Sequence, residues 1–350
     1  MDIPFRGDHL GGIPFIEKAS PAMHRRIARL VIPAVILAFG LMAAPGHACA
    51  DAIEVQTQAV PLNAQDPAQT KLGKLIYRGG IEMLSRSDRF GGLSSLGLSA
   101  DGKRMVSISD EGNRFDANLV YGPDGNLSGV TNAEIFTLTG PGNLPLMDKA
   151  LSDAESMAAG VDGSIIVAFE RNHRIWAYPP DQTDPHPIPL PAEMRKAPAN
   201  RGIEALTLLN DGSLFALSEG LGRGGASLAW VSNPRGWSVL LYRTEDNYRP
   251  TGAATLPNGD VVVVERYFTP REGVRVRMRR ILAKDIHPGG EVSGELLADL
   301  REPLTVDNFE GIEAIKGPKG ETLIFLISDD NFKRMGPQRT LLLMFELADD

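Results

Sequence analysis

The chain has 350 residues and a formal net charge of −8, with 43% hydrophobic and 23% charged residues, an ordinary composition for a folded globular protein. The acidic balance argues against non-specific nucleic-acid binding, which needs a basic surface. Cys49 is the only cysteine and lies in the leader described below, so the rest of the chain has no disulfide, no cysteine nucleophile and no cysteine metal site.

Residues 1–50 are predicted to be a leader that contains a secretory signal peptide at about 23–50. Basic residues precede an uncharged, mostly apolar stretch of 15 residues (30–44), and the residues before position 51 fit a small-residue cleavage site. A membrane-spanning helix needs roughly 20 apolar residues, so we expect cleavage after Ala50 and no stable membrane anchor afterwards. Because the residues before Met23 do not resemble a signal, Met23 is an alternative start. The mature protein is therefore predicted to be secreted or periplasmic.

Residues 51–350 are predicted to form one domain. The leader carries five Lys and Arg and three Asp and Glu, so 31 basic and 41 acidic residues remain in this domain. Its three histidines, His173, His186 and His287, are far apart and show no metal-ligand spacing, which argues against a histidine-rich zinc site.

From residue 92 onward, five hairpins are predicted, each with a small or acidic residue, an apolar run, a turn, a second apolar run and an acid. In chain order they span 92–112, 153–174, 201–220, 250–268 and 309–332. Their turns are Asp101-Gly102, Asp162-Gly163, Asp211-Gly212, Asn258-Gly259 and Lys319-Gly320. An Asp-Gly or Asn-Gly pair between apolar runs is a strong hairpin signal, because the favoured turn needs positive φ at both central residues.

Two further strand candidates follow each of the first four hairpins, which gives units of four strands. The units start at 94, 155, 204, 251 and 313, so they repeat every 47 to 62 residues. This period is typical of an all-β fold, a β-propeller whose four-stranded blades surround a central channel. A β-sandwich of independent hairpins is the alternative, and the shared signature favours the propeller.

The fifth unit shows only three strands of its own. We expect its outer strand to come from the N-terminal segment 72–82, which would close the ring and leave no loose edge. Five blades are visible in the sequence, and a sixth built around residues 52–60 is the alternative count.

The hairpin geometry predicts where the acids lie. The first strand starts, and the second ends, on the face opposite the turn, so these two ends are neighbours in space. Glu155, Glu204 and Glu313 are therefore expected around the channel mouth. The closing acids are expected slightly farther out: Asp110, Glu170, Glu219, Glu265 and Asp329.

Crowded carboxylates raise one another's pKa unless cations lie between them. Calcium is one candidate, because it takes six to eight oxygen ligands, with Glu155, Glu204, Glu313, Asp110 and Asp329 as the metal ligands. Adjacent arginines such as Arg171, Arg223 and Arg266 are the other source of positive charge. For any single acid, a purely structural ion pair is the alternative interpretation.

Several of these motifs, taken in order, resemble the bacterial phytase-like family described as having esterase-like activity. They are GGLSSLGLSADGKRMVSISDEG, DAESMA with VAFERNHRI, NRGIEALTLLNDG with LSEG, and NFEGIEAI with LISDDNF, within residues 73–347. The resemblance implies a secreted β-propeller, distantly similar to calcium-dependent propeller phytases, with ester-hydrolysing activity. The chain lacks the histidine- and lysine-rich clefts expected of a phytase, so phosphate and carboxylic esters both stay open as substrates.

The main hypothesis is a hydrolase for a small anionic or ester substrate. One of Glu170, Glu219 or Glu265 would act as general base, and His173 is a candidate proton shuttle. Arg171, Arg223 and Arg266 would hold an anionic group. The alternatives are a lactonase-like metalloenzyme and a non-catalytic ligand-binding propeller with structural calcium. No G-x-S-x-G motif is present, which disfavours a serine hydrolase, and the oligomeric state stays open.

Overall fold

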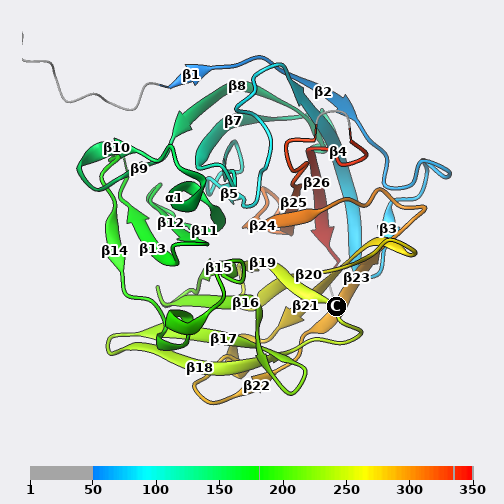
Figure 1. Ribbon diagram of the computed structural model, residues 1–350. Helices are drawn as coiled ribbons and strands as arrows, with labels where there is room; N and C mark the ends of the chain where they lie inside the picture. The colour runs from blue at the N-terminus through cyan, green and yellow to red at the C-terminus, as the bar shows by residue number, and fades with distance from the viewer. Residues whose placement is uncertain (1–49, 181, 334–335, 349–350) are drawn as a thin grey trace, which may run out of the picture. The chain divides into compact units, whose positions relative to one another are not determined.

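The computed structural model describes residues 50–180, 182–333 and 336–348, so the signal segment predicted at about 23–50 lies outside the described residues except for Ala50. Five sheets, antiparallel except for one short edge strand, stand around a central channel as the blades of a β-propeller (Figure 1). Across the described ranges, every helix is too short to cross a bilayer. The ring of five sheets confirms the predicted propeller fold.

The first two blades follow the predicted hairpins. Blade 1 consists, from the channel outward, of β5 (Gly97–Leu98), β6 (Arg104–Ile108), β7 (Asn113–Tyr121) and β8 (Leu127–Thr137), with β1 (Asp51–Ala52) at its outer edge. Blade 2 consists of β11 (Ala154–Ala159), β12 (Ile165–Phe169), β13 (Arg174–Tyr178) and β14 (His186–Ile188). The connection between them carries β9 (Thr139–Gly140), η1 (Pro141–Asn143), β10 (Leu144–Pro145) and the one-turn helix α1 (Lys149–Ser152).

Blades 3 and 4 repeat the plan. Blade 3 consists of β15 (Ile203–Leu208), β16 (Leu214–Arg223), β17 (Ala226–Asn233), β18 (Gly236–Arg243) and a short parallel strand β22 (Glu291–Val292). Blade 4 consists of β19 (Arg249–Thr255), β20 (Val261–Thr269), β21 (Gly273–Ile281) and β23 (Glu295–Leu300). Two further 3-10 turns, η2 (Ala192–Lys196) and η3 (Ala283–Asp285), lie in the connections.

Blade 5 closes the ring with strands from both ends of the described chain. Its inner strands are β24 (Phe309–Lys316), β25 (Thr322–Ser328) and β26 (Leu341–Leu347), and β4 (Leu75–Ser85) pairs with β26 in antiparallel register. The outer strand predicted at 72–82 is therefore confirmed, with slightly shifted bounds. Strand β2 (Val55–Ala59) pairs with β4, which also carries the short β3 (Lys71–Leu72). Residues 52–60 thus extend blades 1 and 5, and the blade count is five.

The hydrophobic core is divided among the five interfaces between neighbouring blades. Strand β20 shows why, because side chains alternate along a strand: Val261 and Val263 pack toward blade 3, whereas Val262 and Val264 pack toward blade 5, and all four are fully buried. A continuous β-branched run is what a strand buried on both faces needs. This packing fixes each inner strand against its neighbours, and so fixes what the inner strands present to the channel.

Candidate active site at the channel mouth

The inner strand of each of blades 2–5 carries a β-bulge at the same place. The register shifts between 154 and 156, 203 and 205, 250 and 252, and 309 and 311. A bulge leaves one residue without a partner on the next strand and re-aims its side chain. The bulged residues are Glu155, Glu204, Thr251 and Glu310, and Ser94 holds the matching place in blade 1, one residue after the Leu93–Ser109 bridge. The hairpin turns lie at the far ends of these strands, as the sequence predicts.

This register corrects the equivalence predicted for Glu313. The motif Gly311-Ile312-Glu313 matches Gly202-Ile203-Glu204 by eye, but the bulge in blade 5 falls at Glu310, three residues earlier. Glu313 lies farther along β24, where its carboxylate accepts a hydrogen bond from the Ala314 amide at 2.8 Å. Burial raises the pKa of Glu313 to about 8. Glu310, which the sequence reasoning missed, takes the place at the mouth.

A second ring is formed on the second strands by the residue that comes directly after the partner of the residue before the bulge, or, in blade 1, after Ser109 of the Leu93–Ser109 bridge. These residues are Asp110, Glu170, Glu219, Arg266 and Asp329. The prediction is wrong for Glu265, because Glu265 pairs with Pro250 and therefore faces the other side of its strand. Its carboxylate is fully buried, accepts a hydrogen bond from the Tyr242 hydroxyl at 2.8 Å, and pairs with Arg279 at 3.1 Å. Glu265 is thus a structural acid between blades 3 and 4.

Beneath the two rings the channel closes. One residue past the bulge, the inner strands carry small residues: Ser95, Ser156, Ala205, Gly252 and Gly311. A side chain at Gly252 would lie 2.2 Å from the Glu310 carbonyl, so the backbones approach too closely for anything larger. The next residues are apolar and buried: Leu96, Met157, Leu206, Ala253 and Ile312. The cavity that these layers line together with Glu204 and Glu310 is about 10 Å³, about the space of one water, so it leaves no room for a larger ligand below the mouth.

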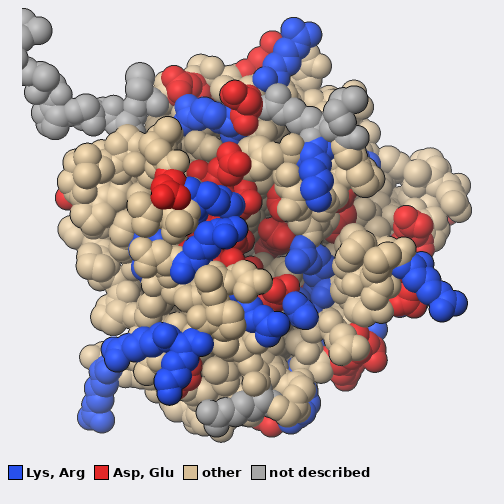
Figure 2. Space-filling view, viewed as in Figure 1, with Lys and Arg blue, Asp and Glu red and all other residues tan. Residues whose placement is uncertain are grey.

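The carboxylates at the mouth lie close enough to oppose one another's ionisation. Burial and then the neighbouring Glu204 and Glu310 raise the pKa of Glu155 well above its ordinary value. Burial and then Glu219 and Glu170 do the same to Glu204. Figure 2 shows this crowding as acidic side chains in the hollow at the centre of this face, with basic side chains around them.

The opposite edge of the mouth shows the same crowding. Burial and then Glu310 raise the pKa of Asp329 to about 8. Burial also raises the pKa of Asp110, against the effect of Lys149, and of Glu310, against the effect of Arg266. These are the conditions under which carboxylates bind a cation or a proton.

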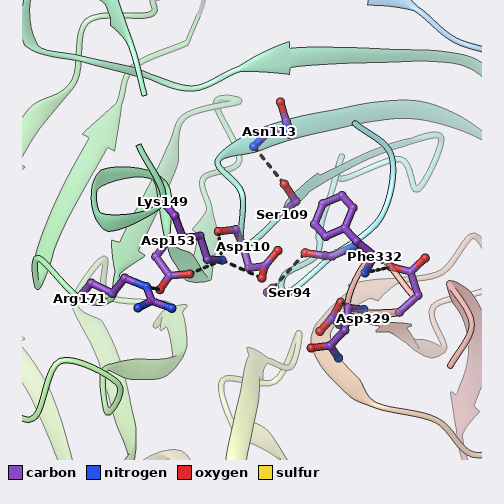
Figure 3. A network of polar contacts seen from close by, with 12 residues as sticks. Ser94, Ser109, Asp110, Asn113, Lys149, Asp153, Arg171, Asp329 and Phe332 are labelled. Atoms are coloured by element: carbon purple, nitrogen blue, oxygen red, sulfur yellow. Dashed lines mark hydrogen bonds and ion pairs between the residues drawn. The ribbon is translucent and has the colours of Figure 1, made fainter. Parts of the chain in front are cut away.

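Protein cations enter the mouth at two places. Arg266 Nη1 donates to Glu310 Oε1 at 2.8 Å and its other terminal nitrogen lies 3.8 Å from Glu219, which Arg249 also approaches at 3.6 Å. On the other side, Lys149 from α1 bridges Asp110 and Asp153, and Arg171 contacts Asp153 at 2.5 Å (Figure 3). Arg266 therefore replaces an acid in the second ring.

The comparisons agree with this architecture. The profile of the phytase-like family, described as esterase-like activity of phytase, matches residues 88–332, which include all five hairpins. The chain belongs to the phytase-like family. Among curated proteins, none matches the sequence.

Solved structures similar to this phytase-like propeller share little of its sequence. A protein of unknown function from Dyadobacter fermentans is 14% identical with a TM-score of 0.41, over 85% of this chain and 94% of that one. The PQQ-bound aldose sugar dehydrogenase of Streptomyces coelicolor is 12% identical with a TM-score of 0.40, over 84% and 98%. Hydrazine synthase of Kuenenia stuttgartiensis is 12% identical with a TM-score of 0.34, over 73% of this chain and only 63% of that one. At such values they carry no argument about activity.

Within the described residues, the phytase-like mouth contains one group of carboxylates that fits a metal ion. Ligand oxygens of Asp153, Glu155 and Glu170 all lie within 4.8 Å of one another. The donors are carboxylate oxygens, which suit a hard cation such as calcium. Asp110 gives a second indication of a cation at the mouth, because its Oδ1 is buried and has no hydrogen-bond partner among the described residues. A buried acceptor without a donor is costly, so the residues present fit a cation.

The remaining predicted residues are placed as follows. His173 follows the second ring in blade 2, where its Nε2 lies 3.0 Å from the Pro198 carbonyl oxygen. Burial raises the pKa of the neighbouring Glu170, against the hydrogen bond that its carboxylate accepts from the Gly202 amide. Arg171 lies at the mouth, where it pairs with Asp153. The side chain of Arg223 lies outside what the structure describes, so its predicted role stays a prediction.

Sequence reasoning missed Asp153, Lys149 and Asn308 as well as Glu310. Asp153 and Asn308 both stand two residues before a bulged glutamate, and the Asn308 amide donates to Glu310 at 3.0 Å and to Asp329 at 3.2 Å. Their repeated place in the hairpin was the available signal. Lys149 had none, because it belongs to an insertion without a counterpart in the repeat.

Proposed function

We propose that this phytase-like propeller is a secreted or periplasmic hydrolase of phosphate or carboxylic esters that works at the channel mouth with a bound calcium ion. The observation that carries the proposal is the approach of Asp153, Glu155 and Glu170 within 4.8 Å, inside a ring of further carboxylates whose pKa values are raised. The leader sequence supports export. Asp51 as the first residue of protein recovered from the periplasm or medium tests that part, and an intact leader there would contradict it.

Each group at the mouth has a task in this proposal. Asp153, Glu155 and Glu170 would hold calcium, with Glu204 beside them. Calcium bound there supplies a positive charge that polarises an ester oxygen and lowers the pKa of bound water. The Glu219 carboxylate, held by Arg249 and Arg266 rather than buried among acids alone, is the base that would accept a proton from the attacking water.

Arg171 and Arg249 would orient an anionic part of the substrate. Both side chains are about half exposed, at 49% and 55%, and both guanidinium groups already pair with a mouth carboxylate. A guanidinium can bind a phosphate or carboxylate with two parallel hydrogen bonds. The narrow cavity below the ring keeps the substrate at the surface, so the bond to be cleaved must project into the mouth.

The test is hydrolysis by the mature protein of p-nitrophenyl phosphate, p-nitrophenyl acetate, a simple lactone and an inositol polyphosphate, each with calcium and with a chelator. We expect ester hydrolysis in calcium, a loss of at least roughly tenfold in chelator, and recovery when calcium is restored. Glu155→Gln and Glu204→Gln should weaken calcium binding. The control is Glu291→Gln, since Glu291 pairs with Arg243 on an exposed outer strand.

Three outcomes would overturn the proposal. Hydrolysis that ignores the chelator would remove the metal from the mechanism. Cleavage of the lactone alone would favour the lactonase-like alternative. Calcium binding without hydrolysis of any substrate would favour the non-catalytic ligand-binding propeller.

A further inference from the structure

Of the four cations described at the mouth, Lys149 alone does not come from a blade. It opens α1, a single turn in the connection between blades 1 and 2, whose N-cap Asp148 accepts a hydrogen bond from the Ala150 amide at 2.9 Å. In Figure 3 its side chain reaches between Asp110 of blade 1 and Asp153 of blade 2. The insertion therefore delivers a positive charge to the junction of two blades.

The ammonium group contacts three oxygens of the kinds that also bind metal ions. Lys149 Nζ lies 2.6 Å from the Asp110 carbonyl oxygen, 2.8 Å from Asp110 Oδ2 and 2.5 Å from Asp153 Oδ1. One backbone carbonyl and two carboxylate oxygens are a donor set that calcium accepts. Because an ammonium group has three N–H donors, these contacts use all of them and leave none for a substrate.

The fold holds this lysine in place. Arg174 donates to the Leu151 carbonyl of α1 and is itself stacked on Phe169 at 3.8 Å and on Trp176 at 4.2 Å. The Asp153 amide also donates to the Lys149 carbonyl, which ends the helical turn beside the mouth. These contacts hold α1 in place, so the ammonium group has a defined position at the mouth.

We propose that Lys149 occupies a cation position between blades 1 and 2 and takes the place of a second metal ion. The inference rests on the proposed function, because it assumes that the neighbouring group of Asp153, Glu155 and Glu170 holds calcium. The mouth then works with one metal ion and one lysine at adjacent positions that share Asp153. Removal of the ammonium opens the second position, where Asp110 Oδ1, buried and without a partner among the described residues, is a further ligand.

Calcium stoichiometry, measured by equilibrium dialysis and calorimetry with calcium chloride, tests the proposal. Lys149→Gln should bind one more calcium ion per chain than the wild type, whereas Lys149→Arg should keep the wild-type number. Lys74→Gln is the matched control, since Lys74 is exposed to the same extent (39% against 40%) and pairs with Glu295 on an outer strand. Equal stoichiometry in the wild type and Lys149→Gln, including no binding in either, overturns the proposal.

Thermal melting provides a second readout if Lys149→Gln folds poorly. In chelator the variant should melt below the wild type, and calcium should raise its Tm more than that of the wild type. A variant that stays unfolded in saturating calcium would show that a free cation cannot replace the ammonium, and would also overturn the proposal. Neither measurement depends on hydrolysis. A wild-type protein without hydrolytic activity would therefore overturn the proposed function but would not decide whether Lys149 takes the place of a second metal ion.

Discussion

At the scale of single residues, two neighbours in β20 show how one step along a strand separates structure from function. Glu265 points into the interface with blade 3, where it meets Tyr242 and Arg279, while Arg266 points to the mouth and meets Glu219 and Glu310. Successive side chains of a strand face opposite sides. The two charges therefore belong to different networks although one peptide bond joins them.

Neutralising Glu265 should change the stability of the protein, whereas neutralising Arg266 should change its affinity for calcium. Glu265→Gln removes the charge from a fully buried ion pair and should lower the free energy of unfolding by about 2 kcal/mol, with calcium affinity unchanged. Arg266→Gln removes a positive charge beside the carboxylates and should tighten calcium binding by on the order of 1 kcal/mol, a several-fold lower Kd. Urea unfolding and calcium titration check both variants. A weaker calcium affinity in Glu265→Gln would contradict the assignment to two networks.

At the scale of elements, the hairpins were predictable because each turn depends on a few adjacent residues. An Asp-Gly or Asn-Gly pair fixes where a hairpin reverses. Gly163, Gly212 and Gly259 adopt positive φ of 88°, 81° and 93°, whereas the Asp or Asn before each does not, so the turns differ from the expected type with positive φ at both residues. Counting seven residues from these glycines reaches Glu170, Glu219 and Arg266, all at the mouth. That constant count would have identified Arg266, whereas a search for the nearest acid chose Glu265.

The bulges were not predictable in the same way, because a bulge depends on how two strands pair rather than on one residue type. In blade 5 the loop has the same five residues (317–321), but both strands between the loop and the bulge are two residues longer than in blade 2, so the count of seven from Gly320 stops at Ile327, before Asp329. The Gly-Ile-Glu motif then drew attention to Glu313 instead of Glu310. Contacts delivered from outside the repeat, such as that of Lys149, depend on tertiary structure alone.

The closure of blade 5 by β4 makes a prediction about folding. Leu75, Ile81 and Met83 of β4 are 0–1% exposed, and burying each such side chain contributes about 1.5–3 kcal/mol. Their sum is comparable with the roughly 5–15 kcal/mol that stabilises a whole domain. A variant that starts at Gly91 should therefore lose cooperative melting and aggregate through the bare edge of β26. Size-exclusion chromatography and circular dichroism measure this.

A variant that starts at Ala50 is the control for that truncation and should fold as a soluble protein. Adding residues 50–90 as a separate peptide should restore part of the folded signal to the shorter variant, because β4 contributes a complete strand. A soluble Gly91 variant with the melting curve of the Ala50 control would show that the ring does not need β4.

At the scale of the whole molecule, the propeller gathers acids from all blades but one onto one face and leaves the opposite face to the turns. The fold does this by repetition, since each hairpin brings both of its ends to the same side. Lys149, Arg171, Arg249 and Arg266 offset part of the charge. In the described part of the chain, nine carboxylates stand around the mouth: Asp110, Asp153, Glu155, Glu170, Glu204, Glu219, Glu310, Asp329 and Asp330. The stability of the molecule must therefore depend on what neutralises them.

That dependence predicts how stability changes with pH when no calcium is present. The pKa values of Glu313 and Asp329 rise from 4.5 and 3.8 to about 8 on folding, mainly through burial. A carboxyl group with a raised pKa binds its proton more tightly in the folded state, so its contribution to stability is full below the unfolded pKa and is lost as the pH rises toward 8. The turn aspartates Asp101, Asp162 and Asp211 have lowered pKa values, and their opposite effect is complete above about pH 4.

In chelator, the Tm should therefore fall as the pH is raised from 5 to 8, and Glu313→Gln should make this fall shallower. At the mouth carboxylates, which do not include Glu313, calcium competes with protons for the same oxygens, so its stabilising effect should be small near pH 5 and largest near pH 8, where these carboxylates are ionised. Melting curves across this range, with chelator and with calcium, measure both effects. A Tm in chelator that stays level or rises with pH would mean that the mouth carboxylates are neutralised by the protein's own cations, and calcium would then lose its structural reason to bind.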